Sequence, residues 1–77
     1  MKINLLAFGQ VAEITGKQNR KVSGVKTTDE LKQKLEAEYA ALKLVSYSIA
    51  VNKVIIRNNT SLSNEDTVAL LPPFSGG

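Results

Sequence analysis

The two most apolar stretches of this 77-residue chain lie near its opposite ends. Residues 2–8 predict a strand with apolar side chains on both faces, and residues 68–71 predict a second strand of the same kind. A strand that is apolar on both faces belongs inside a sheet, where both faces are covered. We therefore expect these two strands to lie side by side at the centre, parallel to each other and joined through the whole intervening chain.

The segments between these two strands predict a short helical turn and three more strands. Gly9 would end the first strand, and residues 10–15 would form the turn, which Gly16 closes with a left-handed cap. Tight-turn residues at Asn52 and Lys53 would join two of the strands in a hairpin. The three strands are expected at residues 18–25, as a weakly patterned edge, and at residues 46–51 and 54–56.

The clearest helix begins at Thr27, whose hydroxyl can cap the first turn while Glu30 completes a capping box. Apolar side chains then follow at spacings that place them on one face of a helix. They are Leu31, Leu35, Tyr39 and Leu42. The order of elements predicts an α+β fold in which a mixed sheet of about five strands packs on one main helix. This layout is that of the β-grasp, or ubiquitin-like, fold, in a single domain covering residues 1–77.

The residue types of this chain make several functions improbable. With no cysteine and no histidine, the chain lacks a thiolate nucleophile, the commonest general base and the commonest metal ligands. We therefore expect no metal site and no catalysis by the chain alone. The net charge of +3 comes from scattered basic residues with few aromatics, which favours a solvated surface over nucleic-acid binding. The apolar runs are too short to cross a membrane, and we expect the cytoplasm.

Two adjacent carboxylates, Glu65 and Asp66, precede the last strand. A carboxylate pair can perform acid–base chemistry. The neighbouring polar residues predict a turn here, and acidic side chains commonly stabilise turns. The position therefore favours a role in the turn over a catalytic one.

The chain ends in a segment that can leave the domain, residues 72–77, which read Pro72, Pro73, Phe74, Ser75, Gly76 and Gly77. Proline fixes φ and lacks an N–H, so the diproline should end the last strand and hold the tail extended. The two glycines have no Cβ and could enter a narrow channel of a partner. The alternative is a frayed terminus with no role.

The sequence resembles the MoaD family, the small, sulfur-carrying subunits of molybdopterin synthase. The resemblance covers nearly the whole chain, in residues 5–16, 28–31, 50–52 and 62–77. Its most specific part is a strand followed by two prolines, two variable residues and Gly-Gly. The thiamin sulfur carrier ThiS is similar in fold and ending, but is usually shorter and lacks the diproline. Residues 18–25 show little of the family pattern, and leucines stand at positions 70 and 71, where aromatic residues are common.

This resemblance implies that Gly77 carries the chemistry through its α-carboxylate. An adenylating enzyme of the ubiquitin-activating type (MoeB type) would use ATP to activate it, and a sulfur donor would convert it to a thiocarboxylate. The tail would enter the large catalytic subunit (MoaE type, in a heterotetramer) and give its sulfur to cyclic pyranopterin monophosphate. Ser75 and Gly76 would control access, and the chain itself would bind no cofactor.

Four apolar residues are candidates for the surface that docks the large subunit: Phe8, Leu62, Leu71 and Phe74. The alternative is that Phe8, Leu62 and Leu71 belong to the core. Two other functions remain open. The chain could be a modifier that is conjugated to lysines through Gly77, or an interaction domain whose tail is incidental.

Overall fold

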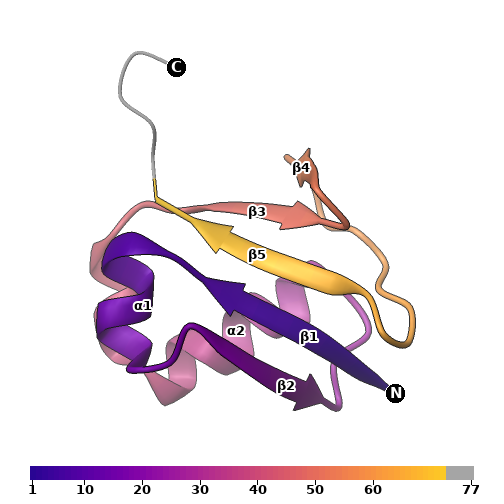
Figure 1. Cartoon of the computed structure of the whole chain (residues 1–77), viewed down its shortest axis with the longest axis horizontal. Coiled ribbons are helices and arrows are strands. Elements are labelled where there is room, and N and C mark those ends of the chain that lie inside the picture. Colours follow the sequence, from indigo (N-terminus) through magenta and orange to yellow (C-terminus); the bar gives the residue numbers. More distant parts are fainter. Residues whose placement is uncertain (73–77) are drawn as a thin grey trace.

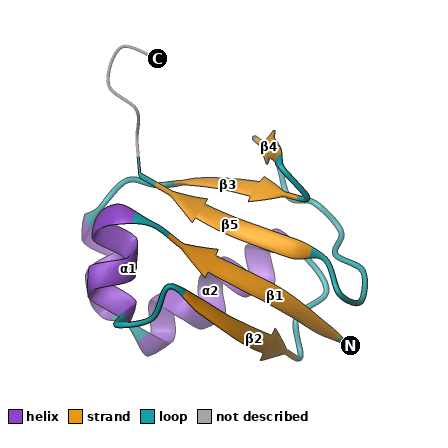
Figure 2. Cartoon of the chain, in the orientation of Figure 1, coloured by secondary structure: helices purple, strands orange, loops and turns teal. Residues whose placement is uncertain are grey.

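Five strands form one mixed sheet in the computed structural model, which describes residues 1–72 (Figures 1 and 2). Their order across the sheet is β2-β1-β5-β3-β4. The strands are β1 (Lys2–Ala7), β2 (Asn19–Ser23), β3 (Ser48–Val51), β4 (Val54–Ile56) and β5 (Thr67–Leu71). Each strand predicted from the sequence is present, with ends that differ by one or two residues.

The first and last strands pair in parallel inside the sheet, as predicted. Their register runs from Asn4 opposite Thr67 to Ala7 opposite Leu70. The amide of Phe8 extends the contact by donating to the carbonyl of Leu70 at 3.2 Å. The chain therefore leaves β5 beside the end of β1.

The outer strands also take the predicted positions. β2 pairs antiparallel with β1 at one edge of the sheet, and β4 pairs antiparallel with β3 at the other. Asn52 and Lys53 make the two-residue turn between β3 and β4, with φ angles of 50° and 75°. Positive φ at both positions is the type I′ turn that suits the twist of a hairpin.

The predicted helical turn after β1 is a complete helix, α1 (Gly9–Thr15). Gly16 ends it with φ 75°, and its amide donates to the carbonyl of Ala12 at 2.8 Å. This is the left-handed cap that the sequence predicted.

The main helix, α2 (Thr28–Glu38), begins with the predicted capping interactions. The hydroxyl oxygen of Thr27 accepts a hydrogen bond from the amide of Glu30 at 3.2 Å. The Glu30 carboxylate accepts one from the amide of Lys26 at 2.7 Å, one residue earlier than a capping box requires. In the first turn, the amides of Glu30 and Asp29 thus donate to side chains, the latter to Asn59 at 3.0 Å.

The prediction of one helix reaching Leu42 is wrong. α2 ends at Glu38, and Tyr39 adopts φ −128° and ψ 89°, outside the helical region. A 3₁₀ helix, η1 (Ala40–Leu44), follows and brings Leu42 into the core. The Tyr39 hydroxyl lies 3.5 Å from the Arg20 guanidinium of β2. The apolar spacing therefore continues through Tyr39 into η1, although the α-helix itself ends at Glu38.

The core lies between the sheet and the helices, which cover one of its faces, with α2 behind β1 and β2 in Figure 1. β1 shows how the faces are divided, because Ile3, Leu5 and Ala7 are only 1%, 2% and 3% exposed. The core cluster consists of Ile3, Leu5, Ala7, Val11, Val22, Val25, Leu31, Leu35, Leu42, Leu62, Val68 and Leu70. The other face of the sheet, hereafter the open face, has no helix over it in residues 1–72.

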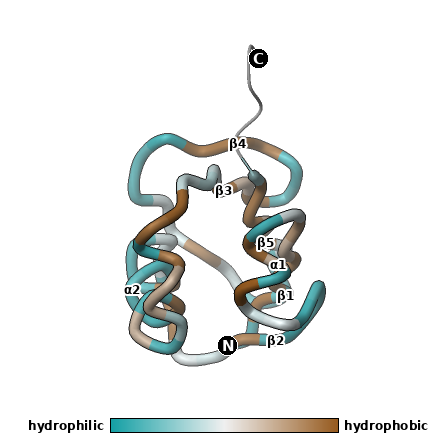
Figure 3. The backbone as a smooth tube through the Cα atoms, turned by 90° about the vertical axis from the view of Figure 1, so that its left-hand side faces the viewer, coloured by the Kyte–Doolittle hydropathy of each residue, from teal (hydrophilic) through white to brown (hydrophobic). Residues whose placement is uncertain are grey.

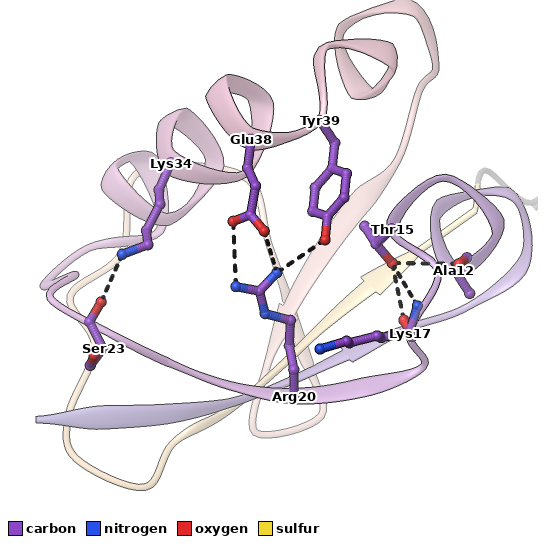
Figure 4. Close-up of polar contacts among 8 residues, drawn as sticks. All are labelled: Ala12, Thr15, Lys17, Arg20, Ser23, Lys34, Glu38 and Tyr39. Atoms are coloured by element: carbon purple, nitrogen blue, oxygen red, sulfur yellow. Dashed lines mark hydrogen bonds and ion pairs between the residues drawn. The ribbon is translucent and has the colours of Figure 1, made fainter.

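Two polar contacts fasten α2 to the edge strand β2 (Figure 4). Arg20 makes two hydrogen bonds with the Glu38 carboxylate, the shorter at 3.0 Å, and this hydrogen bonding lowers the pKa of Glu38. The Lys34 ammonium donates to the carbonyl of Ser23 at 3.2 Å. These contacts link α2 to β2 at the edge of the sheet.

Within residues 1–72, no helix has the length and apolar character that a membrane crossing demands.

A core truncation on α2 should reveal how much the fold depends on the contact of this helix with the sheet. Leu35 is fully buried, so Leu35→Ala should lower the free energy of unfolding by about 2 to 5 kcal/mol through lost transfer energy and a cavity. Leu44, which is 86% exposed, provides the control, because Leu44→Ala should change it by less than about 0.5 kcal/mol. Urea denaturation followed by circular dichroism measures both. Equal effects of the two changes would contradict the packing described here.

Candidate functional site at the root of the carboxyl terminus

The root of the carboxyl-terminal segment is built where β5 ends beside the start of α1 (Figure 1). Gly9 opens α1 with φ 57°, a left-handed conformation that favours glycine. A Cβ placed on Gly9 would lie 3.2 Å from Cγ of Pro72. Backbone conformation and contact therefore both favour a residue without a side chain at this position. Pro72, in turn, is seated against the main chain of α1's first residue.

Backbone hydrogen bonds hold this root to the sheet. Phe8 lies between β1 and α1, and its amide donates to Leu70 in β5 while its carbonyl accepts from the amide of Ala12 in α1, at 3.5 Å. The backbone of Phe8 thus connects the end of the β1–β5 pair with the first turn of α1. These contacts place Pro72, the last described residue, at the end of β5 and beside the first turn of α1.

Gly77, predicted to carry the reacting group, and Ser75 and Gly76, predicted to control its access, lie outside the described residues. Pro73 and Phe74, the latter predicted to dock a partner, lie outside them as well. Their roles, and the extended tail over residues 72–77, stay predictions.

Of the three predicted docking residues within residues 1–72, the structure brings two together. Phe8 is 46% exposed and Leu71 is half-buried, and both lie at the end of the β1–β5 pair where the chain leaves the sheet. Leu62 is 7% exposed and belongs to the core. Its amide donates to the carbonyl of Lys26, near the opposite end of β1. For Leu62, the alternative of a core residue is the correct one.

The open face carries further apolar residues that the sequence analysis did not select. The pairing registers place Leu6, Ala69, Ala50 and Ile55 next to one another in a row across β1, β5, β3 and β4. Leu6 and Ala69 are partly exposed and Ile55 is 52% exposed, while Ala50 is buried although it lies outside the core cluster. Alternation along each strand could have identified them, because residues of one parity share a face. Which parity faces solvent depends on where the helices lie.

The two adjacent acidic residues belong to a turn, as their position favoured. The Asp66 carboxylate accepts hydrogen bonds from the Asn52 side chain at 3.0 Å and from the Ser63 amide at 2.8 Å, which lower its pKa. Glu65 has φ 70°, and its carbonyl accepts from the Asn4 side chain. Asn52 also accepts from the amide of Thr67 at 3.0 Å, so the turn is tied to the β3–β4 hairpin.

The described part of the chain contains a partly apolar sheet face that no helix covers, and it contains no cluster of metal ligands. In residues 1–72, no three carboxylate, imidazole or thiol groups are placed to hold a metal ion. Phe8 and Leu71 lie at the end of the β1–β5 pair, next to Pro72, where the described part of the chain ends.

Comparison with known proteins gives the same architecture. One chain of the complex between subunits 1 and 2 of the molybdopterin-converting factor of Helicobacter pylori 26695 is 29% identical, with a TM-score of 0.75 and 100% coverage of both chains. Small archaeal modifier protein 1 of Methanosarcina acetivorans is 25% identical, with a TM-score of 0.83, 99% of this chain covered and 96% of the other. The protein of the same name from Haloferax volcanii is 20% identical at a TM-score of 0.80, with full coverage of both, and supports the fold alone.

The sheet order, the helix packed on it and these neighbours define a ubiquitin-like β-grasp protein, as the sequence predicted. Residues 5–77 match the ThiS family, so the chain belongs to this family of small ubiquitin-like sulfur carriers, which includes the MoaD type. Carriers of this type are non-catalytic subunits of larger complexes.

The turn at Asp66 should make stability depend on pH. Because the pKa of Asp66 is lower in the folded than in the unfolded chain, its contribution is complete above the ordinary value of about 3.9 and is lost as pH falls through the lowered pKa. Asp66→Asn should remove part of the loss of stability on acidification below about pH 4, as measured by urea unfolding at a series of pH values. Glu65→Gln is the control, since the Glu65 carboxylate makes no hydrogen bond in residues 1–72, and it should keep the wild-type profile. An unchanged profile for Asp66→Asn would show that the hydrogen bonds to this carboxylate contribute nothing.

Proposed function

We propose that this chain is the sulfur-carrying small subunit of a molybdopterin synthase, and that the Gly77 carboxylate is the group that carries sulfur. The observation that carries the proposal is the family match over residues 5–77, which extends to the Gly-Gly end. The complex of the Helicobacter pylori molybdopterin-converting factor supports this choice of pathway, because one of its chains aligns with this one over its full length. The contact of Pro72 with Gly9 supports the proposal, because it fixes the point from which the tail would extend.

The Gly77 carboxylate would have to be activated before it could accept sulfur. A carboxylate is a poor electrophile, so a separate adenylating enzyme (MoeB type) would join Gly77 to AMP from ATP, with pyrophosphate leaving. The terminal sulfur of a persulfide would then displace AMP, and a thiol would reduce the resulting acyl disulfide to the thiocarboxylate. This gives a sulfur nucleophile to a chain that has no cysteine. ATP and the persulfide belong to partner proteins.

The large catalytic subunit (MoaE type) would supply the acids and bases of the sulfur transfer to cyclic pyranopterin monophosphate. The small side chains of Ser75, Gly76 and Gly77 would let the tail pass a narrow channel, because the two glycines have no Cβ. The first of these steps uses ATP and the last a phosphorylated pterin, and we assign the route to the cytoplasm.

Docking of the large subunit would use the open face and the root of the tail. Phe8 and Leu71 lie beside the exit of the chain, and Leu6 and Ala69 continue an apolar surface across the central strands. An aromatic residue at the centre of such a surface is a frequent hot spot of binding. Phe74, two residues beyond Pro72, would bind within the partner's channel.

A second candidate function is favoured by the similarity to small archaeal modifier protein 1. A modifier would use the same adenylated Gly77 but form an isopeptide bond with a lysine. Mass spectrometry separates the candidates, because a carrier gains the mass of one sulfur in place of one oxygen. A modifier leaves a branched Gly-Gly remnant on other proteins. A thiamin-type carrier would also form the thiocarboxylate, but its sulfur would not reach the pterin.

Deletion of Gly77 should abolish sulfur transfer. The change moves the carboxylate by up to about 3.6 Å, and adenylation requires the reacting atoms in near-attack geometry. The truncated chain should show no thiocarboxylate by mass spectrometry after incubation with the adenylating enzyme, ATP and a persulfide donor. Its melting temperature should match that of the full chain. Leu44→Ala, far from the tail in sequence and exposed, is the control and should be thiolated at the full rate. Full thiolation of the truncated chain would refute the proposal.

Replacement of the two phenylalanines should separate docking from folding. Phe8→Ala and Phe74→Ala should each weaken the complex with the large subunit by at least about 1 kcal/mol, as expected when an aromatic anchor is removed. Isothermal titration calorimetry measures the binding, and thermal unfolding of each free variant gives its stability. Leu62→Ala should instead lower the melting temperature, because this residue is in the core. A Phe8 variant that binds fully but melts earlier would show that Phe8 is structural.

A further inference from the structure

The β4 edge of the sheet leaves backbone groups free to pair with another strand. In a hairpin closed by a two-residue turn, the pair next to the turn exchanges hydrogen bonds and the following pair does not. Val51 and Val54 form the first pair here, and Ala50 and Ile55 the second. The N–H and C=O of Ile55 therefore point away from β3. Within residues 1–72, no other group takes these positions.

The opposite edge of the sheet is different. At β2, the carbonyl of Ser23 accepts from Lys34, and Arg20 crosses to Glu38, so side chains of α2 lie against this edge (Figure 4). The tube in Figure 3 shows β4 as a hydrophobic segment with hydrophilic chain on both sides. Val54 and Ile55 are 64% and 52% exposed, respectively. Of the two edges, β4 is the one prepared to accept a strand.

A groove of about 360 Å³ adjoins β4 on the side of α2. Ile49 and Ile56, which pair across β3 and β4, contribute to its apolar part, and Ile55 also borders it. The first turns of α2 form its far wall. Asn59 lies on its wall, where its side chain accepts from the amide of Asp29 at 3.0 Å. Side chains of a strand added to β4 could enter this groove on alternate positions.

The charges around this edge are mainly positive. Lys53 and Arg57 flank β4, and Lys32 stands across the groove, with its ammonium 5.8 Å from the centre of the Tyr47 ring. Asp29 is the carboxylate of the groove lining. A second copy of the chain would pair poorly here, because antiparallel pairing centred on Ile55 sets Lys53 opposite Arg57 twice. Basic residues on an edge strand are a known means of preventing such pairing between copies.

We propose that the β4 edge and its groove bind an extended, acidic segment of a partner protein by strand addition. An antiparallel segment centred on Ile55 would hydrogen-bond with the free N–H and C=O of that residue. Its positions two before and two after the centre would lie opposite Arg57 and Lys53, where carboxylates are favoured. The chemistry therefore specifies three apolar residues between two acidic ones. This surface is separate from the tail and does not depend on the sulfur-carrying function.

The probe is an acetylated and amidated heptapeptide, Gly-Asp-Val-Ile-Val-Asp-Gly, titrated into the ¹⁵N-labelled full chain. Amide shifts should change at residues 53–57 and at Lys32, and the affinity should fall as salt rises. The matched peptide with lysine in place of both aspartates should bind at least tenfold more weakly. Equal binding of the two peptides, absence of shifts at millimolar peptide, or shifts centred on Leu6 and Ala69 of the open face would each overturn the proposal.

Two variants test the geometry. Ile55→Pro removes an N–H that the fold does not use, and proline is tolerated at such an edge position, so the free chain should keep its spectrum while affinity falls at least tenfold. Arg57→Glu keeps the backbone and should weaken binding about fivefold or more, whereas Lys21→Glu on β2 should leave it unchanged. If Ile55→Pro unfolds the chain, the affinity of the Arg57→Glu variant tests the proposal by itself.

If Lys21→Glu weakens binding as much as Arg57→Glu does, the proposal that the peptide binds at the β4 edge is wrong. Dimerisation of the free chain through β4 would also refute it, in favour of a second copy.

Discussion

The parallel pairing of β1 with β5 is the interaction on which the other elements depend. It joins residues from the two ends of the chain, with Asn4 opposite Thr67 and Ala7 opposite Leu70. Closing so long a loop costs conformational entropy, which burial of Leu5, Val68 and Leu70 against α2 offsets. The pairing also sets the place from which the carboxyl-terminal residues leave the domain.

The contact between Gly9 and Pro72 fixes the position of the residue that follows the β1–β5 pair. Pro72 follows the last residue of β5 and lies against the backbone of the first residue of α1. Proline has little freedom in φ, and Phe8 anchors the adjoining backbone to Leu70. In the proposed carrier function, contacts that hold Pro72 in place would reduce the conformational freedom that is lost when a partner binds the tail. Specificity for partners can then reside in the open face.

The two edges of the sheet show different solutions to one problem. An unpaired edge invites pairing with any extended chain. At β2, Arg20 and Lys34 connect the edge to α2, and the Glu38 carboxylate balances the charge. At β4, the strand is short, and Lys53 and Arg57 flank it. This charge excludes copies of the chain itself while admitting an acidic segment, which is how an edge can be both protected and selective.

Much of the fold could be predicted from local patterns. The Thr27 cap, the Gly16 cap and the Asn52-Lys53 turn follow from residue chemistry that acts over a few positions, and each is present. The end of α2 was predicted wrongly, because Tyr39 leaves the helix where it meets Arg20 of β2, a residue far away in sequence. The burial of Leu62 was left undecided for the same reason, since its neighbours come from other parts of the chain.

For the candidate site, the sequence by itself determined the small residues at the end of the chain and the prolines that precede them, since these are properties of residue type. It also determined that β1 and β5 are apolar on both faces and so belong inside the sheet. Only the tertiary structure decided that Gly9 contacts Pro72 and that Phe8 and Leu71 lie together, apart from Leu62. It also decided that the backbone groups of Ile55 have no partner within residues 1–72. Those facts depend on register and on which face the helices cover, and both are set by contacts between residues distant in sequence.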